Sequence, residues 1–140
     1  MTAVPAAAHC DAAASRLGLL RRAQLETALR AAEGERRFAL YVQVGARQDP
    51  AARLATAQAL ATRHGWTVVD RAVDNTGQAD PATRPQLARL LAAARRREIH
   101  GVLAASRDDI SDDDGMYEAM LEQIRTLGAG LALASEENVL

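Results

Sequence analysis

The chain has 140 residues, 49% of them hydrophobic, which suits one compact core and makes a two-domain enzyme unexpected. Its Lys+Arg total of 17 is entirely arginine, and the absence of lysine excludes Schiff-base catalysis and the phosphate-binding lysine of a P-loop. The net charge of -1 conceals an uneven distribution. Residues 1–107 carry 16 arginines and 9 acidic residues, whereas residues 108–140 carry one arginine and 9 acidic residues.

The sparse cysteines, histidines and aromatic residues exclude several kinds of site. Cys10 is the only cysteine, so a disulfide within the chain and a cysteine zinc site are excluded. His9, His64 and His100 are too scattered to suggest a metal cluster, and we expect no metal and no cofactor. Only 3% of the residues are aromatic, too few for a surface that stacks single-stranded nucleic acid.

The sequence offers no signal peptide and no membrane span. The first residues contain no basic segment, and no run of about 18 apolar residues occurs anywhere. We therefore expect a cytoplasmic protein that has no membrane partner.

The amino-terminal segment differs from the rest of the chain. Residues 1–14 are rich in alanine without sustained periodicity, which predicts a flexible leader. Between Ser15 and Ala32, leucines recur at roughly helical spacing among arginines, which predicts an amphipathic helix. This helix could pack on its own domain, the reading we favour, or contact a partner. We divide the chain into residues 1–34, the leader and helix, and residues 35–140, one α/β domain.

The remaining residues alternate apolar runs with helical patterns. Four runs have the length and composition of buried strands: residues 38–44, 66–70, 99–105 and 131–134. The helices expected between them span about residues 49–64, 84–97 and 116–127, with Asp49 as the cap of the first and Pro50 at its first helical position. This alternation predicts right-handed βαβ units, that is, a three-layer α/β fold with a mostly parallel four-stranded sheet.

Three loops follow the predicted strands. In a parallel sheet, sites form at the carboxyl ends of the strands, so residues 45–49, 70–84 and 106–114 are the candidates. The segment from 74 to 81 is dense in turn residues and should be exposed.

Short motifs in these segments occur in the order and spacing of a known family. The segments are 41–45 (Tyr-Val-Gln-Val-Gly), 65–69 (Gly-Trp-Thr-Val-Val), 74–77 (Asp-Asn-Thr-Gly), 84–91 (Arg-Pro-Gln-Leu-Ala-Arg-Leu-Leu), 107–112 (Arg-Asp-Asp-Ile-Ser-Asp) and 130–137, which ends in Glu. From about residue 37 to 137, the chain resembles the N-terminal catalytic domain of the serine recombinases, the resolvase and invertase group. The resemblance implies the resolvase-like fold.

The resemblance also implies a chemistry that this chain lacks the residues to perform. In the family, a serine attacks a DNA phosphodiester to form a phosphoserine link, and several arginines neutralise the phosphate. The family serine corresponds to Gly45, which has no side chain to carry the intermediate. Losing a nucleophile or a charge clamp typically costs on the order of 10²- to 10⁶-fold in rate.

The arginines of the family pattern have changed as well. Gln43 replaces the first-strand arginine, and two aspartates, Asp109 and Asp112, replace the two later ones. A carboxylate about 4 Å from a phosphate charge is repelled by roughly 4 kcal/mol at an effective dielectric of 20. Only Arg84 and Asp108 match the residues that the resemblance marks as catalytic, so we expect a degenerate site.

Three functions stay open at this point. The first is a catalytically inactive recombinase-like domain that acts as an interaction or regulatory module connected with DNA transactions. The second is a small α/β protein that holds a phosphate or nucleotide through Arg84 and Arg47. The third is a divergent recombinase that cleaves with a substitute nucleophile, Ser111 or Thr76, although neither has a base nearby to activate it.

Two charged segments have alternative interpretations. The aspartates from Asp108 to Asp114 could bind Mg²⁺, but we favour capping of the following helix and interaction with its dipole. The basic run 95–97 could touch a nucleic-acid backbone, but cations also suit the end of a helix. The family's long dimer helix and DNA-binding domain have no counterpart in this sequence, so we expect only weak DNA binding. A homo-oligomer or a protein partner is the expectation that goes with the interaction module.

Overall fold

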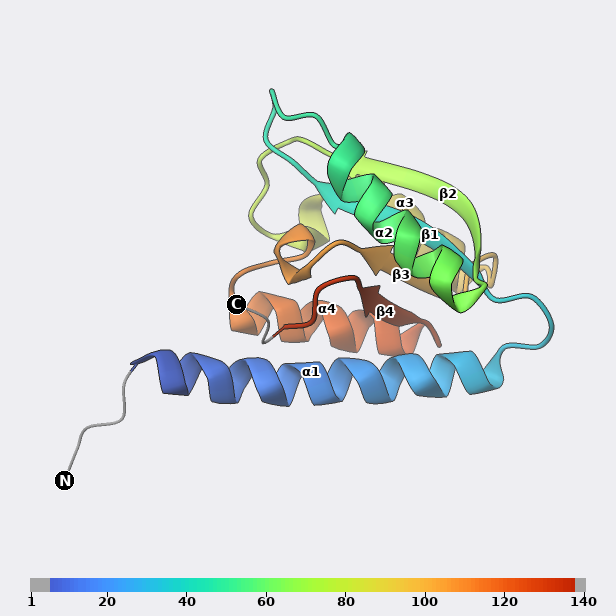
Figure 1. Ribbon diagram of the computed structural model, residues 1–140, viewed down its shortest axis with the longest axis horizontal. Helices are drawn as coiled ribbons and strands as arrows, with labels where there is room; N and C mark the ends of the chain where they lie inside the picture. The colour runs from blue at the N-terminus through green and yellow to red at the C-terminus, as the bar shows by residue number, and fades with distance from the viewer. Residues whose placement is uncertain (1–5, 138–140) are drawn as a thin grey trace.

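A single parallel sheet organises the chain, and the computed structural model describes residues 6–137 of it (Figure 1). The strands are β1 (Arg37–Gln43), β2 (Thr67–Asp74), β3 (Gly101–Ala104) and β4 (Gly130–Leu133), in the order β2-β1-β3-β4. All neighbouring pairs are parallel. The helices are α1 (Ala6–Ala31), α2 (Ala51–His64), α3 (Pro85–Arg95) and α4 (Asp114–Thr126), with short 3₁₀ helices η1 (Pro81–Thr83) and η2 (Arg107–Asp109). The predicted fold class is confirmed.

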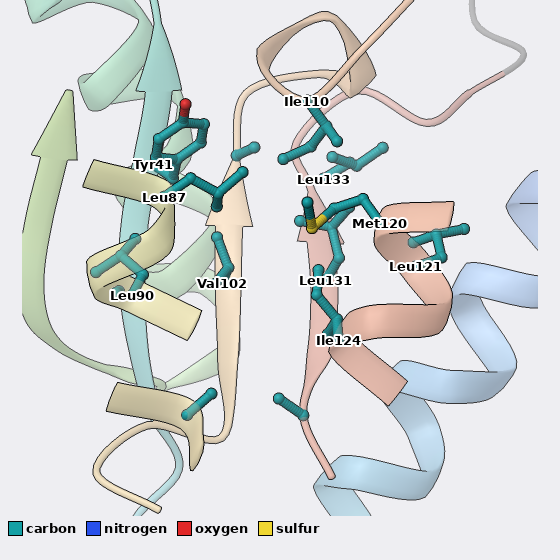
Figure 2. Close-up of a cluster of buried hydrophobic side chains, with 14 of the residues drawn as sticks. Tyr41, Leu87, Leu90, Val102, Ile110, Met120, Leu121, Ile124, Leu131 and Leu133 are labelled. Carbon is teal, nitrogen blue, oxygen red and sulfur yellow. The ribbon is translucent and has the colours of Figure 1, made fainter. Parts of the chain in front are cut away.

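Helices cover both faces of the sheet and divide the core in two. On one face, residues of α3 and α4 pack with Tyr41, Val102 and Leu131 (Figure 2). On the other face, Ala57, Leu60 and Ala61 of α2 pack against the sheet. The chain passes from β1 outward to β2 and then returns across β1 to β3, so the strand order reverses between β1 and β3. In α/β sheets, ligands bind at the carboxyl ends of the strands beside such a reversal.

Strand β2 is longer than the sequence predicts. It continues beyond Asp70 to Asp74, and its last four residues pair with residues 40–43 of β1. Because β2 is an edge strand, polar residues such as Arg71 can face solvent without interrupting the hydrogen-bonded ladder. The prediction from the apolar run alone therefore placed the end of this strand too early.

Two predicted features at helix starts are also wrong. Helix α1 begins at Ala6 rather than near Ser15, so the predicted flexible leader is helical over residues 6–14, while residues 1–5 lie outside the described part. Alanine has the highest helix propensity of all residues. This propensity explains why residues 6–14 are helical although they lack a hydrophobic periodicity. At α2, Pro50 is the N-cap residue instead of the first helical residue, and the Asp49 carboxylate accepts from the Ala51 N–H at 2.9 Å.

Helix α1 lies along the edge strand β4 (Figure 1). Leu17 is fully buried in the cluster under α3 and α4, while Leu25 and Leu29 pack into the cluster under α2. The helix approaches β4 closely at Gly130, where an added Cβ would lie 2.7 Å from the Leu25 Cα. The structure therefore supports the interpretation that this helix packs on its own domain.

Replacing Gly130 with alanine is therefore expected to destabilise the protein by about 1–3 kcal/mol, since backbone must move to admit the methyl group. The matched control is Gly45→Ala, whose Cβ would meet only Gln48 side-chain atoms at 3.4 Å or more. Urea unfolding curves for the two variants measure the difference. Equal stabilities would show that α1 does not pack as closely as described.

His100, just before β3, couples stability to pH. Its Nδ1 accepts from the Arg37 N–H at 2.9 Å, and burial, with the charges of Arg37 and Arg36, lowers the pKa of His100 below 6.5. A lowered folded-state pKa gives stability that is complete above about pH 6.5 and is lost as the pH falls through the folded value. The melting temperature should fall between pH 7.5 and 5, and less so in His100→Asn, which keeps an acceptor but does not titrate. Identical pH profiles of the two proteins would contradict this assignment.

Candidate functional site

Two adjoining hollows open at the carboxyl end of β1. The first, of about 540 Å³, is lined by Gln43, Val44, Gly45, Gln48, Asp49, Arg53 and Asp108. The second, of about 480 Å³, is lined by Gln43, Gly77, Gln78, Ala79, Arg84, Asp108, Ser111, Asp112, Asp113 and Met116. Both include Gln43 and Asp108, so the two hollows form one cleft, and we call it the strand-end cleft. It lies where the reversal of strand order predicts a site.

Gly45 lies exposed in the first hollow, directly after β1 and Val44. Its backbone N–H donates to the Gln48 Oε1 at 2.7 Å, and the Gln48 N–H donates back to the Gly45 carbonyl at 3.0 Å. An added Cβ would meet only Gln48, at ordinary contact distances from 3.4 Å upward. Neither backbone strain nor crowding therefore requires glycine here, and a serine would fit.

Asp109 is a fully buried carboxylate beneath the cleft. Its oxygens accept from the backbone N–H groups of Gln43, Ala105 and Ser106 at 3.0–3.1 Å. They also accept two hydrogen bonds from the guanidinium of Arg53, at 3.0 and 2.9 Å. The carboxylate thus joins the ends of β1 and β3 to α2, and only an acceptor of hydrogen bonds can perform this role.

Arg84 belongs to a second buried network, in which its side chain donates hydrogen bonds to other groups of the protein. The guanidinium donates to the carbonyls of Asp109, Gln78 and Ala79 at 2.7, 2.9 and 3.3 Å, and to the hydroxyl of Tyr41 at 3.4 Å. With 2% of the residue exposed, little of it is left for a ligand. The role of Arg84 in anion binding stays a prediction.

Asp74, the last residue of β2, completes this network. Its carboxylate accepts from the Tyr41 hydroxyl at 2.9 Å and from the N–H groups of Gln86 and Leu87 at the start of α3. Burial raises the pKa of Tyr41 well above 10, so the hydroxyl stays protonated and donates. The tyrosine and aspartate of the family-like motifs therefore hold β1, β2 and α3 together.

The loop before α4 has an acidic, exposed surface. Asp108 and Asp112 are exposed, and Asp113 caps α4 by accepting from the Met116 N–H at 2.8 Å. Asp114 accepts from Arg107 at 2.9 Å. The predicted capping role of this segment is confirmed for Asp113. Among the described side chains of residues 12–137, no three His, Cys, Asp or Glu side chains are grouped so as to hold a metal ion.

The two hydroxyls considered as substitute nucleophiles are placed differently. Ser111 is 5% exposed and lines the second hollow, where its Oγ accepts from the Asp113 N–H at 3.0 Å. Thr76 is exposed, as is Arg47, and neither is among the residues that line the cleft.

The structure brings most of the predicted site residues together. Gln43, Gly45 and Asp108 line the first hollow, Asp112 and Arg84 line the second, and Asp109 lies beneath. The residue that sequence reasoning missed is Arg53, which pairs with a carboxylate 56 positions later in the chain. No local sequence pattern predicts such a pair. The one feature of the sequence that points to Arg53 is its position in the first turn of a helix that follows the first candidate loop.

None of the helices within residues 6–137 combines the length and the apolar character that crossing a membrane would need.

Comparison with known proteins agrees with the architecture. Among solved structures, the chain is similar to the C-terminal catalytic domain of ISC1926 TnpA, an IS607-like serine recombinase (20% identity, TM-score 0.63, 71% of each chain covered). It is also similar to the N-terminal catalytic domain of TP901-1 integrase (18% identity, TM-score 0.63, covering 71% of this chain and 77% of that one). A third is the first open reading frame of transposon ISC1904 from Sulfolobus solfataricus P2 (17% identity, TM-score 0.52, 71% and 67% covered). No curated protein matches the chain.

The sequence also matches a family model. Residues 43–139 fit the model described as the resolvase N-terminal domain, and this segment is more than half of the chain. It contains every residue that lines the strand-end cleft and the buried carboxylates of Asp74 and Asp109. The chain therefore belongs to the resolvase N-terminal domain family.

Proposed function

We propose that this chain is a catalytically inactive resolvase-like domain that serves as an interaction or regulatory module. The observation that carries the proposal is the structural role of the Asp109 carboxylate. Asp109, which the resemblance places at a family arginine, is a buried carboxylate that accepts five hydrogen bonds from the ends of two strands, from η2 and from Arg53. Together with Gly45 in the nucleophile position, this arrangement supports a structural role for a former catalytic centre.

The charge of the strand-end cleft supports the same conclusion. Its lining carries four carboxylates, namely Asp49, Asp108, Asp112 and Asp113, and two guanidiniums, Arg53 and Arg84. Arg53 is paired with Asp109, and Arg84 donates to backbone carbonyls. A phosphodiester placed in the cleft would therefore meet more carboxylates than available cations, and it would be repelled.

A protein partner suits this surface better than a polyanion does. Met116 lines the second hollow and is 39% exposed. Methionine is enriched at protein–protein interfaces, so Met116 is compatible with a protein contact at this hollow. We propose a second copy of the chain or another protein as the partner, and a cytoplasmic location stays a prediction.

The test of inactivity is incubation of the purified protein with supercoiled plasmid, followed by denaturation to trap covalent protein–DNA adducts. We expect neither nicked plasmid nor adduct. The decisive comparison is Ser111→Ala, since Ser111 is the hydroxyl in the cleft. An adduct that forms with the natural protein and disappears in Ser111→Ala would overturn the proposal in favour of a divergent recombinase.

Phosphate or nucleotide binding is the second candidate, because Arg84 is part of the lining of the second hollow, although its guanidinium already donates to backbone carbonyls. Thermal-shift measurements with inorganic phosphate and nucleotides, combined with light scattering, separate the two functions. A dimer without a ligand response supports the interaction module. A monomer that a nucleotide stabilises strongly supports the binding protein.

A further inference from the structure

Negative charge collects at the end of the molecule where the strands finish (Figure 1). Among the described side chains, the aspartates in ion pairs are Asp70, Asp109 and Asp114. The exposed guanidinium of Arg47 lies at the same end, after β1, and offsets one carboxylate. Five exposed aspartates around the strand-end cleft and the start of α4 have no cation partner among the described side chains, and we call them the acidic pole: Asp49, Asp80, Asp108, Asp112 and Asp113.

Positive charge collects at the opposite end, where the helices finish and the strands begin (Figure 1). Arg30, Arg96 and Arg125 are paired there with glutamates. Two exposed glutamates, Glu33 and Glu35, form no ion pair among the described side chains. Four exposed arginines at this end also have no carboxylate partner within the described part of the chain, and we call them the basic pole: Arg36, Arg63, Arg95 and Arg97.

The helix dipoles explain only half of the basic pole. Arg63 and Arg95 lie in the last turns of α2 and α3, where a cation suits the negative end of a helix. Arg36 and Arg97 lie outside the helices. The φ of Arg97 is 61°, a left-handed conformation that disfavours arginine relative to glycine or asparagine. Local structure therefore gives no reason for an arginine at this position, whereas a contact with an acidic surface does.

Each pole also has an apolar part. At the acidic pole, Met116 is 39% exposed and lines the cleft together with Asp112 and Asp113. At the basic pole, a hollow of about 460 Å³ is lined by Arg97 and by alanines of α1 and of the turn before β4. An apolar side chain between carboxylates at one end thus matches an alanine-lined hollow beside a free guanidinium at the other.

We propose that copies of this chain associate head to tail, with the acidic pole of one copy against the basic pole of the next. The aspartates of one copy face the free guanidiniums of the next copy, and Met116 packs against the alanines of the hollow. The contact is heterologous, because each copy uses two different surfaces and leaves one of each free, so that association continues into chains. The inference rests on the proposed function, since it names the partner of the strand-end cleft as a second copy.

Charge favours this arrangement over a symmetric dimer formed through either pole. A two-fold contact would place a pole against the same pole of the other copy, and like charges that face each other repel. Exposed ion pairs contribute little individually and are screened by salt. The association should therefore be weak, and it should decline as the salt concentration rises.

The test is the weight-average mass measured by light scattering over a series of protein concentrations. At low salt, we expect the mass to rise with concentration beyond the mass of a dimer. The apparent Kd should be roughly tenfold or more higher at about 0.5 M salt than at about 0.05 M, because screening shortens the reach of the charges. Met116→Ala should weaken association at both salt concentrations, since its apolar contact is not screened.

Two double variants separate the poles. Asp108→Asn with Asp112→Asn neutralises part of the acidic pole, and Arg95→Gln with Arg97→Asn neutralises part of the basic pole, with asparagine chosen because it tolerates a positive φ. Each variant alone should associate roughly tenfold or more weakly than the natural protein. An equimolar mixture should form a one-to-one pair that stops at the mass of a dimer, because each variant keeps the pole that the other lacks.

The control removes the same amount of positive charge from another surface. Arg71 and Arg89 are exposed on β2 and α3, away from both poles, so Arg71→Gln with Arg89→Gln should associate as the natural protein does. Weakened association in this control, equal to that of the basic-pole variant, would show that net charge rather than the basic pole matters, and it would overturn the proposal.

Three further results would overturn it: a natural protein that stays monomeric at low salt, a mass that levels off at a dimer, or a mixture of the two pole variants no heavier than either alone. If the monomer instead binds a random DNA duplex and the basic-pole variant does not, the basic pole is assigned to a nucleic acid. The plasmid assay tests inactivity separately, so a covalent adduct would overturn the proposed function whether or not the chain associates.

Discussion

Glu137→Ala should lower the free energy of unfolding by about 3–5 kcal/mol, because it removes one member of a buried ion pair. The Glu137 side chain is fully buried and pairs with Arg21, whose side chain is 3% exposed. It also accepts from the Tyr117 hydroxyl at 2.6 Å. Removing the carboxylate leaves a buried guanidinium without its counter-charge, and the contact that joins α1 to α4 is lost.

The matched control uses the neighbouring, exposed ion pair. Glu136 contacts Arg22 at 3.2 Å with side chains 51% and 41% exposed, so Glu136→Ala should change stability by less than about 1 kcal/mol. Replacing both members of the buried pair by apolar residues, Arg21→Met with Glu137→Leu, should recover most of the loss. Urea unfolding by circular dichroism measures all three. Equal effects of the two glutamates would contradict the buried pair.

Acid should weaken the same contact. Burial raises the pKa of Glu137, but the hydrogen bonds from Arg21 and Tyr117 outweigh it, so the pKa lies below 4.5. A lowered folded-state pKa gives stability that is present above about pH 4.5 and is lost as the pH falls through the folded value. The free energy of unfolding should therefore decrease as the pH falls below about 4.5, which urea unfolding at several pH values measures.

Asp109→Ala should cost about 2–4 kcal/mol, because three backbone N–H groups at the carboxyl ends of β1 and β3 lose their acceptor. Arg53 contributes less to this loss, since its side chain is 37% exposed and can turn to water. Asp112→Ala, an exposed position on the same loop, should stay within about 0.5 kcal/mol. Thermal and urea unfolding of both variants measure the contrast.

Asp109→Arg extends the same test. It restores the residue type of the family pattern, yet its guanidinium would face Arg53 and three N–H groups, so the protein should not fold stably. A folded Asp109→Arg variant would show that this position is not the structural carboxylate described above.

The fold could be predicted further than the site. Four apolar runs were enough to predict the parallel sheet, because a strand that is buried on both faces needs continuous apolar residues. Strand β1 is such a strand. The beginning of α1 at Ala6 and the extension of β2 to Asp74 escaped prediction, since neither segment has a hydrophobic periodicity. Alanine propensity and edge pairing decide those boundaries instead.

The charge pattern also changes its meaning in three dimensions. The acidic run that begins at Asp108 reads, along the sequence, as a lost phosphate site. In the fold, Asp109, Asp113 and Asp114 accept from named donors, and Asp108 and Asp112 are exposed in the cleft. Sequence spacing could mark the loop, but only the tertiary contacts separate the structural carboxylates from the exposed ones.

The central claim is that the strand-end cleft no longer holds a phosphodiester. It is tested most directly by an NMR titration with a dinucleotide, which needs no knowledge of a target DNA sequence. We expect no saturable shift of the Gln43, Gly45 and Asp108 amide signals, at low or moderate salt. Saturable shifts at these residues would contradict the account and establish a working phosphate site.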